Sequence, residues 1–121
     1  MTKDQNSKQY DLEARTLAYA KGCRSFVKKL PKTVGDIEDG KQLVRASGSV
    51  GANYIEADEA LSKKDFVMRI KICRKESKES RYWLRLVDTR DAPELDSERA
   101  GIEQEATELM NIFGAILRKS E

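Results

Sequence analysis

The sequence contains no histidine, so it lacks the side chain that metal sites and acid–base catalysis use most often. The paired metal sites of helical bundles depend on Glu-x-x-His motifs, which this chain cannot supply. The two cysteines, Cys23 and Cys73, form no CxxC pair. We therefore expect both thiols to be buried and not to form a disulfide, and we expect no metal site.

The sequence motifs of common nucleotide-binding and hydrolytic enzymes are also missing. There is no GxxxxGK[ST] loop to hold a phosphate chain and no GxSxG turn to expose a nucleophilic serine. The glycines of the GSVG stretch, Gly48 and Gly51, fall inside a predicted helix. The sequence therefore predicts no catalytic residue and no cofactor.

Long apolar runs are absent as well. No stretch approaches the roughly 18 apolar residues of a membrane span, and the opening MTKDQNSKQYDLEA does not resemble a signal peptide. These absences predict a cytoplasmic protein without a membrane partner. The 121 residues include only two prolines and are 39% hydrophobic and 36% charged, which favours one domain of helices with charged outer faces.

Charge is nearly balanced overall but alternates along the chain. The 23 basic and 21 acidic residues give a net charge of +2, which by itself does not indicate a polyanionic partner. Residues 1–31 carry seven basic and three acidic side chains, and residues 32–61 carry three and six. Residues 62–90 carry ten and four, and residues 91–121 carry three and eight. The third segment is therefore the most basic.

Apolar or small residues recur at spacings of four and three, the period of an amphipathic helix. After a tail at 1–10, we expect helices at 11–30, 36–61, 63–88 and 97–120, with N-caps at Asp11 and Ser62 and with Pro93 in the last loop. The expected core stripe consists of Leu12, Thr16, Tyr19, Cys23, Phe26, Leu30, Leu43, Ser47, Val50, Tyr54, Ala57, Leu61, Phe66, Ile70, Cys73, Ser77, Ser80, Leu84, Val87, Ile102, Ala106, Leu109, Phe113, Ile116 and Ser120. Because the loops are short, the sequence predicts an all-α, antiparallel up-down four-helix bundle over residues 11–121.

A second arc of small and apolar residues lies on the helix expected at 36–61. Glycine in a helix interior costs up to about 1 kcal/mol relative to alanine, and close approach of another backbone would compensate for it. That backbone belongs either to a tight crossing within the chain or to another subunit. The helix expected at 63–88 also carries more apolar surface than its packing within a single bundle requires. The predicted oligomer interface comprises Val44, Gly48, Gly51, Ile55, Met68, Ile72 and Trp83.

Polar residues form a further line on the same helix and continue on the next one. Glu76 and Glu79, near Arg69, are candidates for paired interface charges, since no nucleophile accompanies them. The predicted polar network comprises Arg45, Ser49, Asn53, Glu56, Glu76 and Glu79. The alternative is that these residues form a solvated face.

Basic residues gather on one side of the helix expected at 63–88, within an arc of roughly 120°. Helix 11–30 adds further basic residues. The predicted nucleic-acid site comprises Lys21, Arg24, Lys28, Lys71, Arg74, Lys75, Lys78, Arg81 and Arg85. The alternative is again a solvated helix face.

Three stretches carry a family resemblance: RASGSVGANYIEA at 45–57, FVMRIKI at 66–72 and KESKESRYWL at 75–84. From Tyr10 to Arg118 the sequence resembles the four-helix-bundle proteins encoded in intervening sequences of bacterial 23S ribosomal RNA genes. The resemblance implies a bundle that assembles into a homo-oligomeric ring, with a pentamer expected, and a molecular role that is largely unassigned. The architecture is also similar to the accessory proteins of diversity-generating retroelements, basic bundles that work with a reverse transcriptase and nucleic acid.

Two functions follow from these patterns. In the first, a ring binds RNA or another nucleic acid, because it repeats weak basic contacts around an axis. In the second, the oligomer is a scaffold that binds a protein partner and has no nucleic-acid role.

Overall fold

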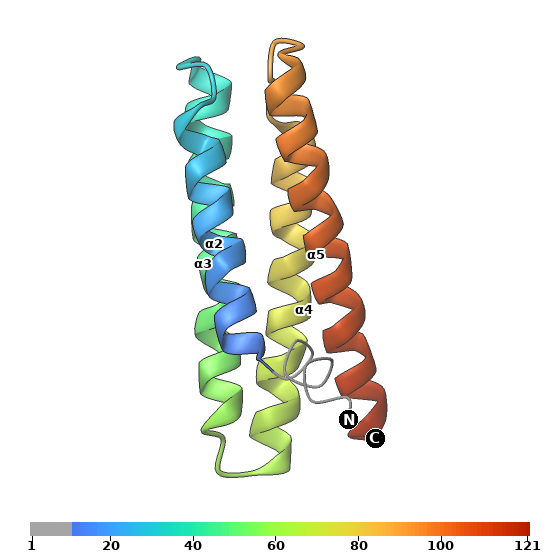
Figure 1. The fold of residues 1–121 in the computed structure, drawn as a ribbon. Helices are drawn as coiled ribbons and strands as arrows, with labels where there is room; N and C mark the ends of the chain where they lie inside the picture. Colours follow the sequence, from blue (N-terminus) through green and yellow to red (C-terminus); the bar gives the residue numbers. More distant parts are fainter. Residues whose placement is uncertain (1–10) are drawn as a thin grey trace.

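The structure, a computed structural model, describes residues 11–121. Its helices are α2 (Leu12–Lys28), α3 (Val34–Asp58), α4 (Lys63–Leu86) and α5 (Pro93–Lys119), and no strand occurs among the described residues. Consecutive helices run in opposite directions (Figure 1). The predicted all-α, up-down four-helix bundle is confirmed. The tail predicted at 1–10 lies outside the described residues.

Short polar side chains begin the first three helices. The carboxylate of Asp11 accepts a hydrogen bond from the backbone N–H of Ala14, and the hydroxyl of Ser62 accepts one from the N–H of Asp65. Both N-caps were predicted. α3 begins slightly earlier than expected, since the hydroxyl of Thr33 accepts a hydrogen bond from the N–H of Asp36.

The start of the last helix corrects the prediction of a loop through residue 96. α5 begins at Pro93, because proline has no N–H and the first turn of a helix needs none. The preceding turn contains Arg90 and Asp91 with positive φ of 55° and 58°. The hydroxyl of Thr89 donates to a carboxylate oxygen of Asp96 at 2.5 Å, which ties this turn to the first turn of α5.

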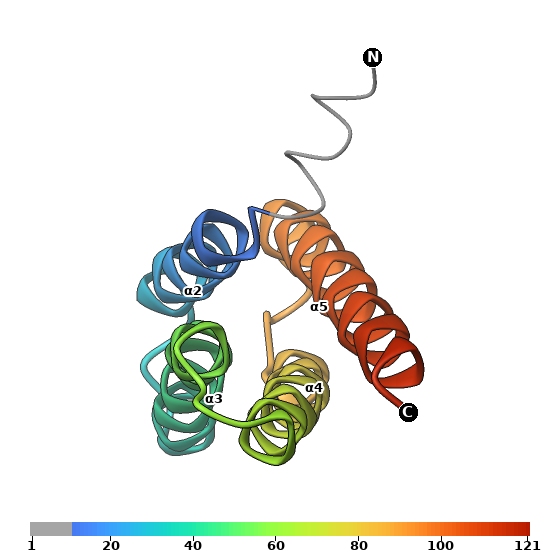
Figure 2. The same cartoon turned by 90° about the horizontal axis from the view of Figure 1, so that it is seen from below.

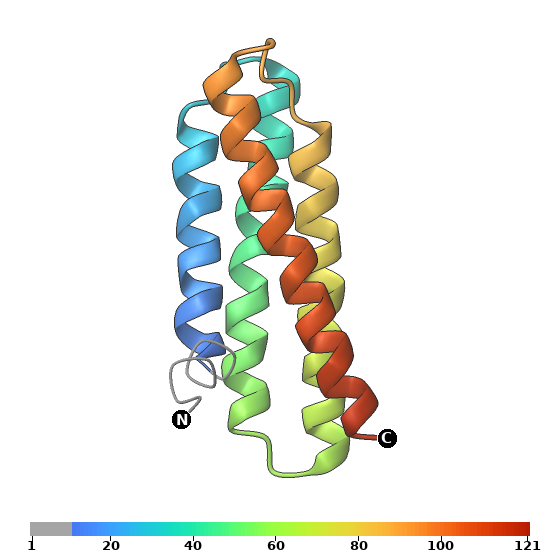
Figure 3. The same cartoon turned by 45° about the vertical axis from the view of Figure 1, so that its right-hand side comes forward.

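Seen from one end, the helices stand at the corners of a square in chain order (Figure 2). α3 packs closely on both α2 and α4, and α4 packs on α5, whereas α2 and α4 are diagonal and share no backbone contact within the described part of the chain. α5 crosses the bundle at an angle (Figure 3). It is linked to α2 mainly by Arg15, which bonds Glu105 at 2.7 and 2.9 Å and Glu108 at 2.7 Å.

The predicted stripe forms the core, with one clear exception. All six expected residues of α2 and its C-terminal end are buried, as are the central residues of α4 and α5. Tyr54, Phe66, Ile102 and Ile116 are half-buried and pack against this core. Leu61 is fully exposed, because α3 ends at Asp58 and the following turn directs this side chain into solvent.

The centre of the core contains small polar residues. The hydroxyl of Ser77 donates to the carbonyl oxygen of Cys73, and that of Ser80 donates to the carbonyl oxygen of Ser77. The hydroxyls of Tyr19 and Ser80 are 2.6 Å apart and join the diagonal helices α2 and α4. Because these groups are satisfied, small side chains let the helices approach closely without a desolvation penalty.

Candidate functional site

The arginines predicted to bind nucleic acid on α4 are directed toward α5. Arg85 pairs with Glu103 at 2.8 Å, and Arg81 donates to the hydroxyl of Thr107 at 3.0 Å. The guanidinium of Arg74 lies over Gly114. Arg81 and Arg85 therefore link helices within the chain, and only part of their donor capacity is left for another molecule.

The lysines of α4 differ from its arginines. Lys64, Lys71, Lys75 and Lys78, which we call the lysine ridge, are exposed on one side of the helix. None of them forms an ion pair with any residue between 11 and 121. At 1.5 Å per residue, about 10 Å of helix separates the Cα atoms of Lys71 and Lys78. The ridge is therefore a line of free positive charge.

The basic residues predicted on α2 lie on the far side of the bundle. Lys21, Arg24 and Lys28 are exposed there, and Arg24 also covers Gly48 of α3. Because α2 and α4 are diagonal, their outer faces point in opposite directions (Figure 2). The structure thus separates the predicted nucleic-acid residues into two sets that do not form a common surface.

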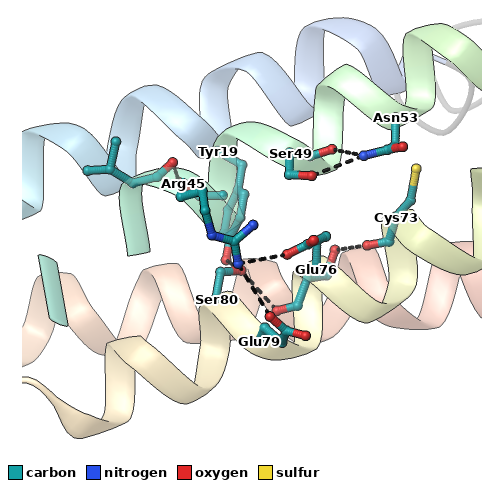
Figure 4. A network of polar contacts seen from close by, with 11 residues as sticks. Tyr19, Arg45, Ser49, Asn53, Cys73, Glu76, Glu79 and Ser80 are labelled. Atoms are coloured by element: carbon teal, nitrogen blue, oxygen red, sulfur yellow. Dashed lines mark hydrogen bonds and ion pairs between the residues drawn. The ribbon is translucent and has the colours of Figure 1, made fainter. Parts of the chain in front are cut away.

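The polar residues predicted as a network lie along the seam between α3 and α4 (Figure 4). Arg45 reaches Glu76 at 3.6 Å and Glu79 at 3.5 Å. Further along the seam, the amide of Asn53 donates to Ser49 and accepts a hydrogen bond from Arg69 at 3.0 Å. These residues form two small groups.

Glu56 corrects the prediction. It is exposed on α3 and makes no hydrogen bond or ion pair with the described residues 11–121. The network therefore ends at Asn53 and Arg69 on this side.

Two buried polar atoms in this seam lack hydrogen-bond partners among residues 11–121. They are Nε of Arg69 and Oε1 of Glu76, a residue that is 7% exposed. The guanidinium of Arg45 attracts the Glu76 carboxylate, but 3.6 Å is too long for a hydrogen bond. Buried polar groups are normally satisfied, so these two enclosed atoms are exceptions within the seam.

The two glycines of the predicted oligomer interface lie between α2 and α3. A Cβ at Gly51 would stand 2.9 Å from the hydroxyl oxygen of Thr16, and one at Gly48 would stand 3.3 Å from the guanidinium of Arg24. The close approach that compensates for these glycines is therefore found within the chain, as the intramolecular alternative proposed. Contact of this arc with another subunit stays a prediction.

The other predicted interface residues occupy several places. Val44 lines a groove of about 420 Å³ between α2 and α3, and Ile55 is exposed near the end of α3. Met68 is exposed on α4, whereas Ile72 and Trp83 are half-buried. The structure brings these residues to two sides of α3 rather than to one patch.

The cysteines are chemically protected. Burial raises the pKa of Cys23 to about 11 and that of Cys73 to about 12, and the thiol of Cys73 lies 3.4 Å from the carbonyl oxygen of Val50. Both are therefore neutral thiols near neutral pH, and only a thiolate is nucleophilic.

We expect an aromatic disulfide reagent at pH 8 to label neither thiol of the folded protein within minutes and both thiols in denaturant. Absorbance of the released thiolate measures the count. Because both pKa values are raised on folding, the thiols stabilise the fold below about pH 8.5 and lose that contribution as the pH rises toward 12. Rapid labelling without denaturant would contradict the burial.

Neither a metal-binding cluster nor a membrane-spanning helix is found within residues 11–121. Residues 11–121 contain no group of three or more cysteine, aspartate and glutamate side chains that could hold a metal ion. None of the described helices is both long and apolar enough to cross a membrane.

Comparisons with known proteins give the family. The model of a family described as 23S rRNA-intervening sequence protein matches residues 8–115. No curated protein matches the chain. Among solved structures, it is similar to a protein of unknown function from the S23 ribosomal protein family of Bacteroides thetaiotaomicron, with 28% identity, 87% of this chain and 96% of that chain covered, and a TM-score of 0.73. The resemblance seen in the sequence is thus confirmed, and the chain belongs to the 23S rRNA-intervening sequence protein family.

Proposed function

We propose that this chain is a non-enzymatic, cytoplasmic protein that assembles into a homo-oligomeric ring, with a pentamer as the expected form, and binds RNA through the lysine ridge of α4. The observation that carries the proposal is the ridge itself, four exposed lysines without an ion pair among residues 11–121. Lysine ammonium groups on flexible stems suit the irregular path of a phosphate backbone.

The ridge has the electrostatics of a phosphate-binding surface. Each lysine that neutralises a phosphate releases condensed counterions, and this release favours binding most at low salt. One ridge offers few contacts, so a single chain would bind weakly. Repetition of the ridge around a ring raises the overall affinity, because one RNA molecule can occupy several ridges at once.

The seam beside the ridge supports the assembly part of the proposal. Met68 is exposed and Ile72 is half-buried on this side of α4. A second copy placed here would cover this apolar surface. Met68 shares a hollow with Lys64 and Lys71, so such a copy would leave Lys75 and Lys78 free.

Charge reversal of two ridge lysines tests RNA binding. We expect K71E/K78E to weaken binding of a structured ribosomal RNA fragment at least about tenfold at 0.1 M salt. The plot of log affinity against log salt should also become less steep, by between one and two units of slope. Fluorescence anisotropy at several salt concentrations measures both quantities.

The matched control is K21E/K28E, which changes the net charge equally on the opposite side of the bundle. We expect it to change affinity by no more than about twofold, because these lysines do not share a surface with the ridge. Equal losses in the two variants would mean that net charge alone drives binding, and unchanged affinity in K71E/K78E would refute the ridge.

A protein-binding scaffold is the second candidate, and the exposed apolar side chains of Ile55 and Met68 favour it. A partner protein could cover these side chains and remove them from water. Light scattering with and without RNA separates the candidates. An oligomer whose mass and elution do not respond to RNA at low salt supports the scaffold and contradicts RNA binding.

A further inference from the structure

An exposed aromatic ring continues the lysine ridge. Tyr82 is 58% exposed and follows Lys78 by four residues and Lys75 by seven, so the three side chains lie on one side of α4. Successive members are about 4.5 to 6 Å apart along the helix axis. Leu86, also exposed, extends the same line by one more turn. An exposed ring thus directly follows the positive charges along one surface.

The ring of Tyr82 is held in place by its neighbour. Its centroid lies 5.1 Å from that of Trp83, with 77° between the ring planes. Trp83 is half-buried and packs against the core. In an edge-to-face pair, at least one face of the exposed ring is left uncovered. Tyr82 therefore presents a flat apolar face at a fixed position next to Lys78.

The one carboxylate near this line is already paired. Glu79 lies on the side of α4 that faces α3, where Arg45 approaches it at 3.5 Å. Its charge is therefore partly neutralised by Arg45, although Glu79 follows Lys75 by one helical turn. The surface made by Lys75, Lys78 and Tyr82 stays positive and apolar, which is complementary to a phosphate backbone that carries exposed bases.

We infer that the lysine ridge and Tyr82 together bind single-stranded RNA, with one unpaired base stacked on the Tyr82 ring and the adjoining phosphates on Lys78 and Lys75. This inference rests on the proposed RNA-binding function and specifies its ligand. A base inside a duplex is already stacked on both faces and cannot cover the ring. An unpaired base can, and stacking on an aromatic side chain strengthens binding of single strands irrespective of sequence.

Anisotropy measurements with a labelled 12-nucleotide single strand and a duplex of the same length test the inference. We expect the single strand to bind about tenfold more tightly than the duplex. Y82A should lose about that factor for the single strand and leave duplex binding unchanged, while Y82F, which keeps the ring, should bind like the original protein. The single tryptophan, Trp83, should change its fluorescence only when the single strand binds.

L17A is the matched control, because Leu17 is similarly exposed but lies on α2. It should bind both RNAs as the original protein does. Circular dichroism verifies that each variant folds.

The possible failures are distinguishable. Absence of binding to either RNA overturns the proposed function and this inference with it. Equal binding of single strand and duplex, unaffected by Y82A, overturns only the inference. A Y82A variant whose mass falls in light scattering while its RNA affinity is unchanged would assign the ring to a subunit contact and would also overturn the inference.

Discussion

Replacing Phe113 with alanine is expected to lower the free energy of unfolding by about 3 to 5 kcal/mol. Phe113 is fully buried, and its ring centroid lies 6.4 Å from that of Tyr54. It stands on the helix that crosses the bundle at an angle, so the surrounding helices cannot all move inward to fill the space. The loss therefore combines the transfer free energy of the ring with the cost of a cavity.

Urea denaturation followed by circular dichroism measures this loss. L61A is the control: Leu61 is another large apolar residue of the predicted core stripe, but its side chain is fully exposed. We expect L61A to change the free energy of unfolding by no more than about 0.5 kcal/mol. Similar losses in the two variants would contradict the placement of both residues.

The second large effect is expected at Gly51. A Cβ at this position would stand 2.9 Å from the hydroxyl oxygen and 3.3 Å from the Cβ of Thr16. That hydroxyl is held by a 2.7 Å hydrogen bond to the carbonyl oxygen of Leu12, so it cannot rotate away freely. We expect G51A to lower the free energy of unfolding by about 1 to 3 kcal/mol through overpacking between α2 and α3.

The matched control is G101A, because Gly101 is also inside a helix but has nothing within 4 Å of an added Cβ. We expect G101A to raise the free energy of unfolding by up to about 1 kcal/mol. If G51A is destabilised by a contact within the chain, the loss in its free energy of unfolding should not depend on protein concentration. A loss that appears only at concentrations where copies associate would place Gly51 at a subunit interface instead.

Much of the bundle could be predicted from the sequence because its determinants are local. The four-three spacing selected the buried face of each helix, and the side chains of Asp11 and Ser62 marked two helix starts. Two predictions from local sequence patterns were wrong at helix ends. The sequence places Pro93 in a loop although proline also suits the first turn of a helix, and Leu61 continues the spacing beyond the residue at which the helix ends.

The candidate site was harder to predict, because it depends on how the helices are ordered in space. Seven basic residues share an arc of α4 in the sequence, but only the packing of α5 shows that Arg81 and Arg85 are held within the chain. The role of Gly51 likewise depends on Thr16, thirty-five positions earlier. Tyr82 was missed, although its spacing from Lys78 was available as a signal.

The opposed directions of the two lysine sets limit how any closed ring can present them. Lys21 and Lys28 are exposed on α2, and the lysine ridge is exposed on α4, which stands at the diagonally opposite corner of the square (Figure 2). A ring of such protomers places the two sets on different walls, one inside and one outside, or one on each flat side. A nucleic acid that followed one wall would not reach the other, so a ring of this kind would carry two independent positive surfaces.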